Sequence, residues 1–152
     1  MRSAVEVGCG TGHFAAFLAQ NGISTISLDR APAMLMEARR LFPSLPVVMG
    51  DAHRLLFKTN SADLAVFVAT LEFLEDPLLA LRAAVRIARR AAVAIALNRR
   101  SLGGLSRRWG PQSRGALLRH ARDYSTAELR AVLVQAAGSR LDAIASASSL
   151  FP

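Results

Sequence analysis

The sequence has a single cysteine and a single lysine among its 152 residues. Because Cys9 has no partner, an internal disulfide and a cysteine-built zinc site are both excluded. The longest stretch without a formal charge, residues 7–28, is interrupted by glycines, Gln20 and Asn21, so it cannot serve as a membrane span. We expect no secretory leader before it. The sequence therefore indicates a protein of the reducing cytoplasm.

Disordered and fibrous structures are also disfavoured, because hydrophobic residues make up 52% of the chain and charged residues 20%. A chain of this length can form one compact domain with a sizeable core, and it is too short for two ordinary enzyme domains. We therefore expect residues 1–152 to form a single domain.

Acidic residues are absent between Asp76 and Asp123, while eleven arginines lie in that segment. The whole chain has a formal net charge of +8, so the excess positive charge belongs to this segment. It favours an anionic partner such as nucleic acid, a phosphorylated metabolite or a lipid headgroup. A compositional bias toward arginine on solvated helix faces explains the same pattern. Both interpretations stay open.

Short apolar runs alternate with segments of helical spacing. We expect strands at residues 4–7, 25–28, 47–49, 64–69 and 93–97, and helices at residues 13–20, 33–41 and 78–88. Alternation of this kind with nearly continuous apolar strands is typical of a parallel sheet covered on both faces. The predicted fold class is α/β, a Rossmann-like doubly wound and mostly parallel sheet in a three-layer α/β/α arrangement.

The rest of the chain has weaker signals. Ser125 and Glu128 have the spacing of a capping box for a helix through about Ala137, which Gly138 would end. Residues 141–145 could form a sixth strand, and residues 98–122 form a long connection with a short helix at 116–121. On the helix at 78–88 and just beyond it, Arg82, Arg86 and Arg89 share one side, so we expect them to point outward.

Residues 6–12 read Glu-Val-Gly-Cys-Gly-Thr-Gly and lie where the first expected strand turns into the first helix. Glycines at alternate positions let the backbone bend sharply and let a ligand approach where a Cβ would collide. The amides at the start of the helix favour an anionic or electron-rich group. The dinucleotide fingerprint G-x-G-x-x-G does not fit, because the third glycine comes one residue early and His13 takes the fingerprint's last position.

Six segments in order, between about Ala4 and Gly138, resemble the class I S-adenosylmethionine-dependent methyltransferases. The glycine segment is similar to the family's first motif, E/D-x-G-C-G-T-G, and residues 29–35 are similar to its acid-x-S-P-x-M-L segment. The other matching segments are residues 50–52, 61–66, 71–77 and 124–129. The resemblance implies S-adenosylmethionine as cofactor and methyl transfer to a small-molecule acceptor.

The resemblance also implies a cofactor site. Asp29 would bind the ribose hydroxyls, and Asp51 with the amide after it would meet the adenine edge. The implied cofactor-binding residues are Glu6, Gly8, Cys9, Gly10, Thr11, Gly12, Asp29, Arg30, Met34, Gly50, Asp51, Ala52, Ala69, Thr70 and Leu71. A doubly wound sheet binds its ligand at the carboxyl ends of its strands, where these segments fall. A capping or surface role for Asp29 and an Asx turn at Asp51 are the alternatives.

No catalytic residue is assigned. Cys9 could be a nucleophile beside His13, and His53, His120 or Tyr124 could act as a base, although a lone histidine is more often a surface or packing residue. Methyl transfer from a sulfonium needs mainly alignment of acceptor, methyl and leaving sulfur, so a strong base is not required for a nucleophilic acceptor. The cysteine and the histidines do not have metal-ligand spacing.

Two alternative functions fit parts of the sequence. A nicotinamide-dependent oxidoreductase has the same fold, but the early third glycine argues against it. Three departures from the family favour a non-catalytic remnant or a partner-binding module. Phe73 stands where many relatives have a histidine, and residues 89–92 replace a K-P-G-G turn. The chain also starts about three residues before its first strand, where relatives have helices that cover the cofactor. We therefore expect an apolar patch beside the cleft, with either self-association into homo-oligomers or poor binding of the cofactor.

Residues 98–122 are expected to form part of the acceptor site, because they follow the fifth strand at the cofactor end of the sheet. Their arginines favour an anionic acceptor, and replacing Arg107 and Arg108 should then raise the acceptor KM. A phosphorylated or carboxylated metabolite fits better than nucleic acid, because only Trp109 and Tyr124 could stack on bases. A solvated loop without a substrate role is the alternative.

Overall fold

The computed structural model describes residues 1–98 and 121–147. Five strands form one sheet in the order β3-β2-β1-β4-β5, and every neighbouring pair is parallel. They are β1 (Ser3–Val7), β2 (Ser24–Asp29), β3 (Val47–Met49), β4 (Ala62–Val68) and β5 (Ala88–Ile95). The predicted α/β class is confirmed. The strand order reverses where β1 lies beside β4, so the ligand crevice of a doubly wound sheet belongs at the carboxyl ends of these two strands.

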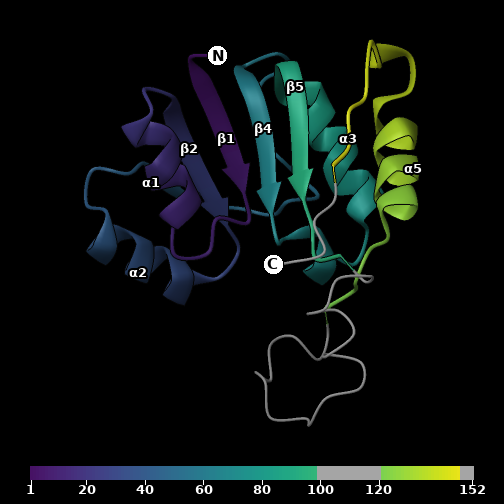
Figure 1. The fold of residues 1–152 in the computed structure, drawn as a ribbon. Coiled ribbons are helices and arrows are strands. Elements are labelled where there is room, and N and C mark those ends of the chain that lie inside the picture. The colour runs from purple at the N-terminus through teal and green to yellow at the C-terminus, as the bar shows by residue number, and fades with distance from the viewer. Residues whose placement is uncertain (99–120, 148–152) are drawn as a thin grey trace, which may run out of the picture.

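Helices cover both faces of this sheet (Figure 1). They are α1 (His13–Gln20), α2 (Pro32–Leu41), α3 (Pro77–Ile87) and α5 (Thr126–Ala137), with short 3₁₀ turns η1 (Leu71–Phe73) and η3 (Gly138–Arg140). Crossover connections between parallel strands are right-handed. From β1 through β2 to β3 the chain moves toward one edge of the sheet, and from β4 to β5 it moves toward the other edge. The first crossovers therefore place α1 and α2 on one face of the sheet, and the last one places α3 on the opposite face. The α5 helix packs beside α3.

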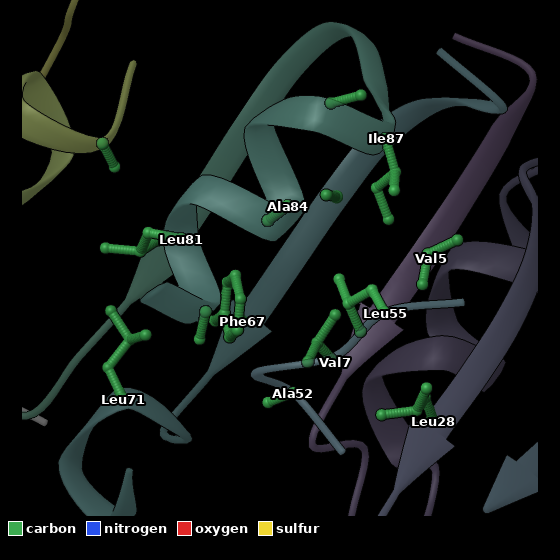
Figure 2. Packing of buried hydrophobic residues seen from close by; sticks show 14 of the residues in the cluster. Val5, Val7, Leu28, Ala52, Leu55, Phe67, Leu71, Leu81, Ala84 and Ile87 are labelled. Carbon is green, nitrogen blue, oxygen red and sulfur yellow. The ribbon is translucent and has the colours of Figure 1, made fainter. Parts of the chain in front are cut away.

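The main core lies between the sheet and the face that α3 and α5 cover. Leu81, Ala84 and Ile87 follow at three-residue spacing along α3 and are completely buried against the sheet, where Phe67 of β4 is also completely buried (Figure 2). The start of α3 is fixed locally, because the Asp76 carboxylate accepts a hydrogen bond from the Leu79 amide at 2.9 Å. A smaller cluster on the opposite face packs Leu18 of α1 against Ala4, Leu64 and Val66.

The capping box predicted for α5 is present in full. The Ser125 hydroxyl accepts from the Glu128 amide at 3.2 Å, and the Glu128 carboxylate accepts from the Ser125 amide at 2.8 Å. The helix ends at Ala137, and Gly138 follows with φ +53, as the sequence indicated. This helix boundary is set by local chemistry, which explains why sequence reasoning placed it correctly.

The fifth strand starts earlier in the chain than the sequence predicts. The prediction places it at residues 93–97, whereas β5 starts at Ala88 directly after α3, so the turn predicted at 89–92 is wrong. Ala88 already pairs with Ala62, and the Asp63 carboxylate lies 3.0 Å from the Arg89 guanidinium and 3.9 Å from that of Arg90. An edge strand tolerates such charged residues, and their pairing partner is distant in sequence.

Two further expectations are wrong. Arg86 does not point into solvent, because its guanidinium donates to the carbonyl oxygens of Leu55 at 2.6 Å and Phe57 at 2.7 Å, where the chain leading to β4 wraps over α3. Residues 141–145 do not form a sixth strand. The Arg140 guanidinium holds the chain before them to the Val85 carbonyl oxygen at 2.9 Å, and the small and polar residues that follow have weak strand propensity.

Several large apolar side chains are exposed, among them Phe17, Met34, Phe73, Val93 and Ile95. The predicted self-association through such a patch stays a prediction. Of the long connection at residues 98–122, only the two ends are described, and the short helix predicted at 116–121 lies almost entirely outside the described residues. Each helix in the described part of the chain is too short or too polar to cross a lipid bilayer.

Candidate functional site

The loop that follows β1 crosses the carboxyl end of β2. The amides of Gly8 and Cys9 both donate to the Leu28 carbonyl oxygen, at 2.7 and 2.9 Å. Gly8, Gly10 and Gly12 all have positive φ, at +74°, +53° and +83°. The alternate glycines therefore produce the sharp bend that the sequence predicted, and the loop ends where α1 begins.

The first two glycines of this loop differ in what surrounds them. A Cβ at Gly8 would lie 2.2 Å from Thr70 Cγ2, so a side chain there collides with the end of β4. Apart from its chain neighbours, a Cβ at Gly10 would meet no atom of residues 1–98 or 121–147 within 4 Å. Gly8 is thus required by packing, whereas the space beside Gly10 is open for a ligand.

Asp29, the last residue of β2, faces the glycine loop. Its Oδ2 accepts from the Gly10 amide at 2.8 Å, and its Oδ1 accepts from the Ala31 amide, also at 2.8 Å. The second contact closes a short turn just before α2. Each oxygen has a further lone pair, so the carboxylate can still accept hydrogen bonds from a diol.

The carboxyl end of β3 lies beside Asp29, because the Gly50 amide donates to the Asp29 carbonyl oxygen at 3.0 Å. A pocket of about 270 Å³ here is lined by Arg30, Met49, Gly50 and Asp51. Asp51 forms the Asx turn considered above, in which its Oδ1 accepts from the His53 amide at 2.9 Å. Within the described part of the chain, no donor reaches its Oδ2.

The carboxyl end of β4 closes the cluster from the other side. The Thr70 hydroxyl lies 3.2 Å from the Gly8 carbonyl oxygen and 3.1 Å from that of Val68. Ala69 has a positive φ of 48°, which a residue with a Cβ seldom adopts. Leu71 differs from the other candidates, because its side chain is buried in the main core and only its backbone could contact a ligand.

The remaining candidates surround these loops. Met34 is exposed in the first turn of α2, Thr11 is half-buried at the start of α1, and Ala52 is buried after Asp51. Gly12 is buried, and a Cβ there would lie 2.9 Å from Leu45 Cδ2. The hydrogen bonds described above thus bring the ends of β1, β2, β3 and β4 to one place, as the sequence predicted.

Glu6 is a buried carboxyl directly beneath this cluster, only 2% exposed. Burial raises the pKa of Glu6 to about 7, a hydrogen bond with the Ala15 backbone opposes the rise, and the nearby charge of Asp29 adds to it. Among the described residues, Glu6 Oε2 has no hydrogen-bond partner. A positive charge bound nearby would therefore favour ionisation of this carboxyl.

Cys9 and Tyr124 are not arranged for the roles of nucleophile and base. Burial raises the pKa of the Cys9 thiol to about 12, and the His13 ring instead lies 3.0 Å from the Thr11 hydroxyl. The Tyr124 hydroxyl is buried and donates to the Leu71 carbonyl oxygen at 3.3 Å, and burial also raises the pKa of Tyr124. His120 lies outside the described residues. No group of three or more metal-ligating side chains occurs in residues 1–98 and 121–147.

Sequence reasoning gave no role to the buried Glu72 near the site, and it considered His53 only as a possible base. Glu72 is 2% exposed. Its Oε1 accepts a hydrogen bond from the Leu97 amide, and its carbonyl oxygen accepts one from the Arg122 amide. Glu72 therefore joins η1 to the segments on either side of the long connection. His53 bridges two loops of the cleft. The spacing Asp-x-His was the available signal for His53, and a lone acid within an apolar segment was the signal for Glu72.

A family model described as a methyltransferase domain matches residues 5–96, which is more than half of the chain. The chain belongs to the methyltransferase domain family. The match runs from β1 through β5 and includes every strand end of the site.

Individual members of this family are similar over shorter stretches. The demethylmenaquinone methyltransferase of Beutenbergia cavernae is 39% identical over 59 residues, 39% of this chain and 25% of the relative. An uncharacterised methyltransferase of Mycobacterium tuberculosis is 31% identical over 88 residues, 58% of this chain and 36% of the relative. The chain therefore spans only about a quarter to a third of these curated relatives.

Among solved structures, a SAM-dependent methyltransferase of Thermotoga maritima is similar with a TM-score of 0.77 and 30% identity. The alignment covers 90% of this chain and 63% of that structure. The likeness extends beyond the matched family segment, so the arrangement of the sheet and its helices is that of a methyltransferase.

Proposed function

We propose that this chain is a single domain that binds S-adenosylmethionine and transfers its methyl group to a small-molecule acceptor in the cytoplasm. The observation that carries the proposal is the convergence of four strand ends at one place, together with the space beside Gly10 that the described residues leave open. Doubly wound sheets bind their ligands at this place. Membership of the methyltransferase domain family and the Thermotoga maritima structure support the choice of cofactor.

The residues of the cleft fit the chemical groups of this cofactor. Asp29 has lone pairs for two ribose hydroxyls, and Asp51 Oδ2 can accept from an exocyclic amine. The buried Glu6 carboxyl can ionise to offset a positive charge, such as an ammonium or a sulfonium. The bound cofactor supplies a methyl group on a positively charged sulfur.

The chain's own contribution to the reaction is alignment. Loops from four rigid strands hold the cleft, and an acceptor that is already nucleophilic needs no strong base. On the acceptor side, Phe73 is 40% exposed, and the backbone of Arg122 is tied to η1 through the Glu72 carbonyl oxygen. We infer a small acceptor with an apolar part and propose an anionic group for it, because arginine pairs well with carboxylate or phosphate.

Gly10→Ala should weaken S-adenosylhomocysteine binding at least tenfold, because the new methyl group would occupy the space proposed for the ligand. Gly22→Ala is the matched control. Gly22 also has positive φ, and a Cβ there would also meet nothing within 4 Å among the described residues, but Gly22 lies in the turn before β2, at the opposite end of that strand. Isothermal titration calorimetry should show reduced affinity only for Gly10→Ala. Equal affinities for the two variants would place the ligand elsewhere.

Asp29→Ala should weaken S-adenosylhomocysteine binding by about 1.5–3 kcal/mol, the range for hydrogen bonds to a charged group. Asp29 also accepts hydrogen bonds from two backbone amides, so its loss could affect the fold. The control is Asp63→Ala near the start of β4, which removes a carboxylate that accepts a hydrogen bond from the Arg2 amide at 2.7 Å. Calorimetry should show the loss only for Asp29→Ala in folded protein. Unchanged affinity would remove the ribose role. Binding without methyl transfer to any of a broad acceptor panel would favour a non-catalytic module.

A further inference from the structure

The His53 ring joins two loops of the cleft that are far apart in the sequence. Its Nδ1 lies 2.8 Å from Asp51 Oδ1, in the loop after β3. Its Nε2 lies 3.3 Å from the backbone nitrogen of Asp76, the residue that caps α3. The ring is largely buried, with 16% of the side chain exposed, whereas 55% of the Asp51 side chain is exposed.

The two contacts define the tautomer of the neutral ring. A backbone amide can only donate, so Nε2 must accept from Asp76. The proton of the neutral ring then lies on Nδ1, which donates to the Asp51 carboxylate. Asp51 Oδ1 thus accepts two hydrogen bonds from one residue, from the ring and from the backbone amide of His53.

We propose that His53 is a positioning residue that fixes the Asp51 carboxylate for recognition of the adenine amine. The proposal rests on the cofactor role assigned to Asp51 above. Two donors on Oδ1 stop the carboxylate from rotating and leave Oδ2 without a donor among the described residues, and Asp51 itself lines the pocket with Arg30, Met49 and Gly50. The ring itself is held by the start of α3, so the orientation of Asp51 is set before the cofactor binds, which avoids an ordering cost on binding.

Two substitutions separate the two contacts of the ring. In His53→Asn, the side-chain amide can occupy the place of Nδ1 and donate to Asp51, but it cannot reach Asp76. In His53→Gln, the longer side chain can accept from the Asp76 amide but does not offer a donor at the place of Nδ1. The backbone contact of residue 53 with Asp51 survives in both variants and in His53→Ala.

The first experiment measures S-adenosylhomocysteine affinity by calorimetry, with thermal unfolding as the check on folding. His53→Ala and His53→Gln should lose about threefold to tenfold in affinity, the effect of freeing one side chain, and His53→Asn should recover most of the loss. If the ring only ties the loop to α3, His53→Gln would be the variant that recovers affinity, and the proposal would be overturned.

The second experiment uses S-inosylhomocysteine, in which an oxygen replaces the 6-amino group of adenine. Wild type should prefer S-adenosylhomocysteine, and His53→Ala should reduce that preference, whereas a purely structural defect would weaken both ligands equally. In an Asp51→Ala background, His53→Ala should cause no further loss. Failure of wild type to bind either ligand would overturn the proposed function and this proposal together. Binding by wild type with an unchanged preference in His53→Ala would overturn only the role of His53.

Discussion

Glu6→Gln should make the protein more stable above pH 7, by up to about 3 kcal/mol, and the gain should fade toward pH 5. Burial in β1 beneath the glycine loop raises the pKa of Glu6 to about 7, so the folded protein keeps a proton that the unfolded chain has already released. Between the pKa values of the two states, the unfolded state binds fewer protons than the folded state. The free energy of unfolding of the wild type therefore falls as the pH rises from about 4.5 to about 7, and it levels off at higher pH.

Urea unfolding of wild type and Glu6→Gln at pH 5, 6, 7 and 8 measures this difference directly. Glu37→Gln is the control, because the exposed Glu37 carboxylate pairs with Arg40 at 2.7 Å, and the hydrogen bonds from Arg40 lower the pKa of Glu37. That substitution should give no gain at high pH. Parallel stability curves for wild type and Glu6→Gln would show that Glu6 ionises normally in the folded protein.

Gly8→Ala should destabilise the fold by about 3 kcal/mol, from backbone strain at positive φ together with steric overlap. The new Cβ would lie 2.2 Å from Thr70 Cγ2 and 2.7 Å from Thr70 Oγ1. The Thr70 side chain cannot move away cheaply, because it is buried and its hydroxyl contacts the carbonyl oxygens of Gly8 and Val68. The loop after β1 and the end of β4 would therefore have to separate.

A double-mutant cycle isolates the overlap from the strain. Gly22→Ala carries nearly the same φ, +77° against +74°, with open space around its Cβ, so it reports the strain alone. The Thr70→Ala substitution removes the methyl and hydroxyl groups with which the new Cβ collides. In the Thr70→Ala background, Gly8→Ala should therefore destabilise the protein much less than it does in the wild type. Gly8→Ala as stable as Gly22→Ala would mean that Thr70 does not restrict the loop.

Local chemistry in the sequence determined most of the element order. The glycine segment at residues 6–12, the strand at Val47–Met49 and the capping box of Ser125 and Glu128 each depend on neighbours within a few residues. The parallel sheet follows from the alternation of strands and helices, and the sheet places the strand ends together. The sequence therefore predicted both the α/β fold and the convergence of the strand ends.

The tertiary structure alone decided the features that depend on distant contacts. Ala88 starts β5 because it pairs with Ala62, and Arg86 is drawn inward by the carbonyl oxygens of Leu55 and Phe57. Gly8 is required because Thr70, from another strand end, occupies the space of a Cβ, and the high pKa of Glu6 arises from the burial that the fold imposes. Periodicity and propensity act over one or two helical turns, so they hold no information on which distant segment fills a given space.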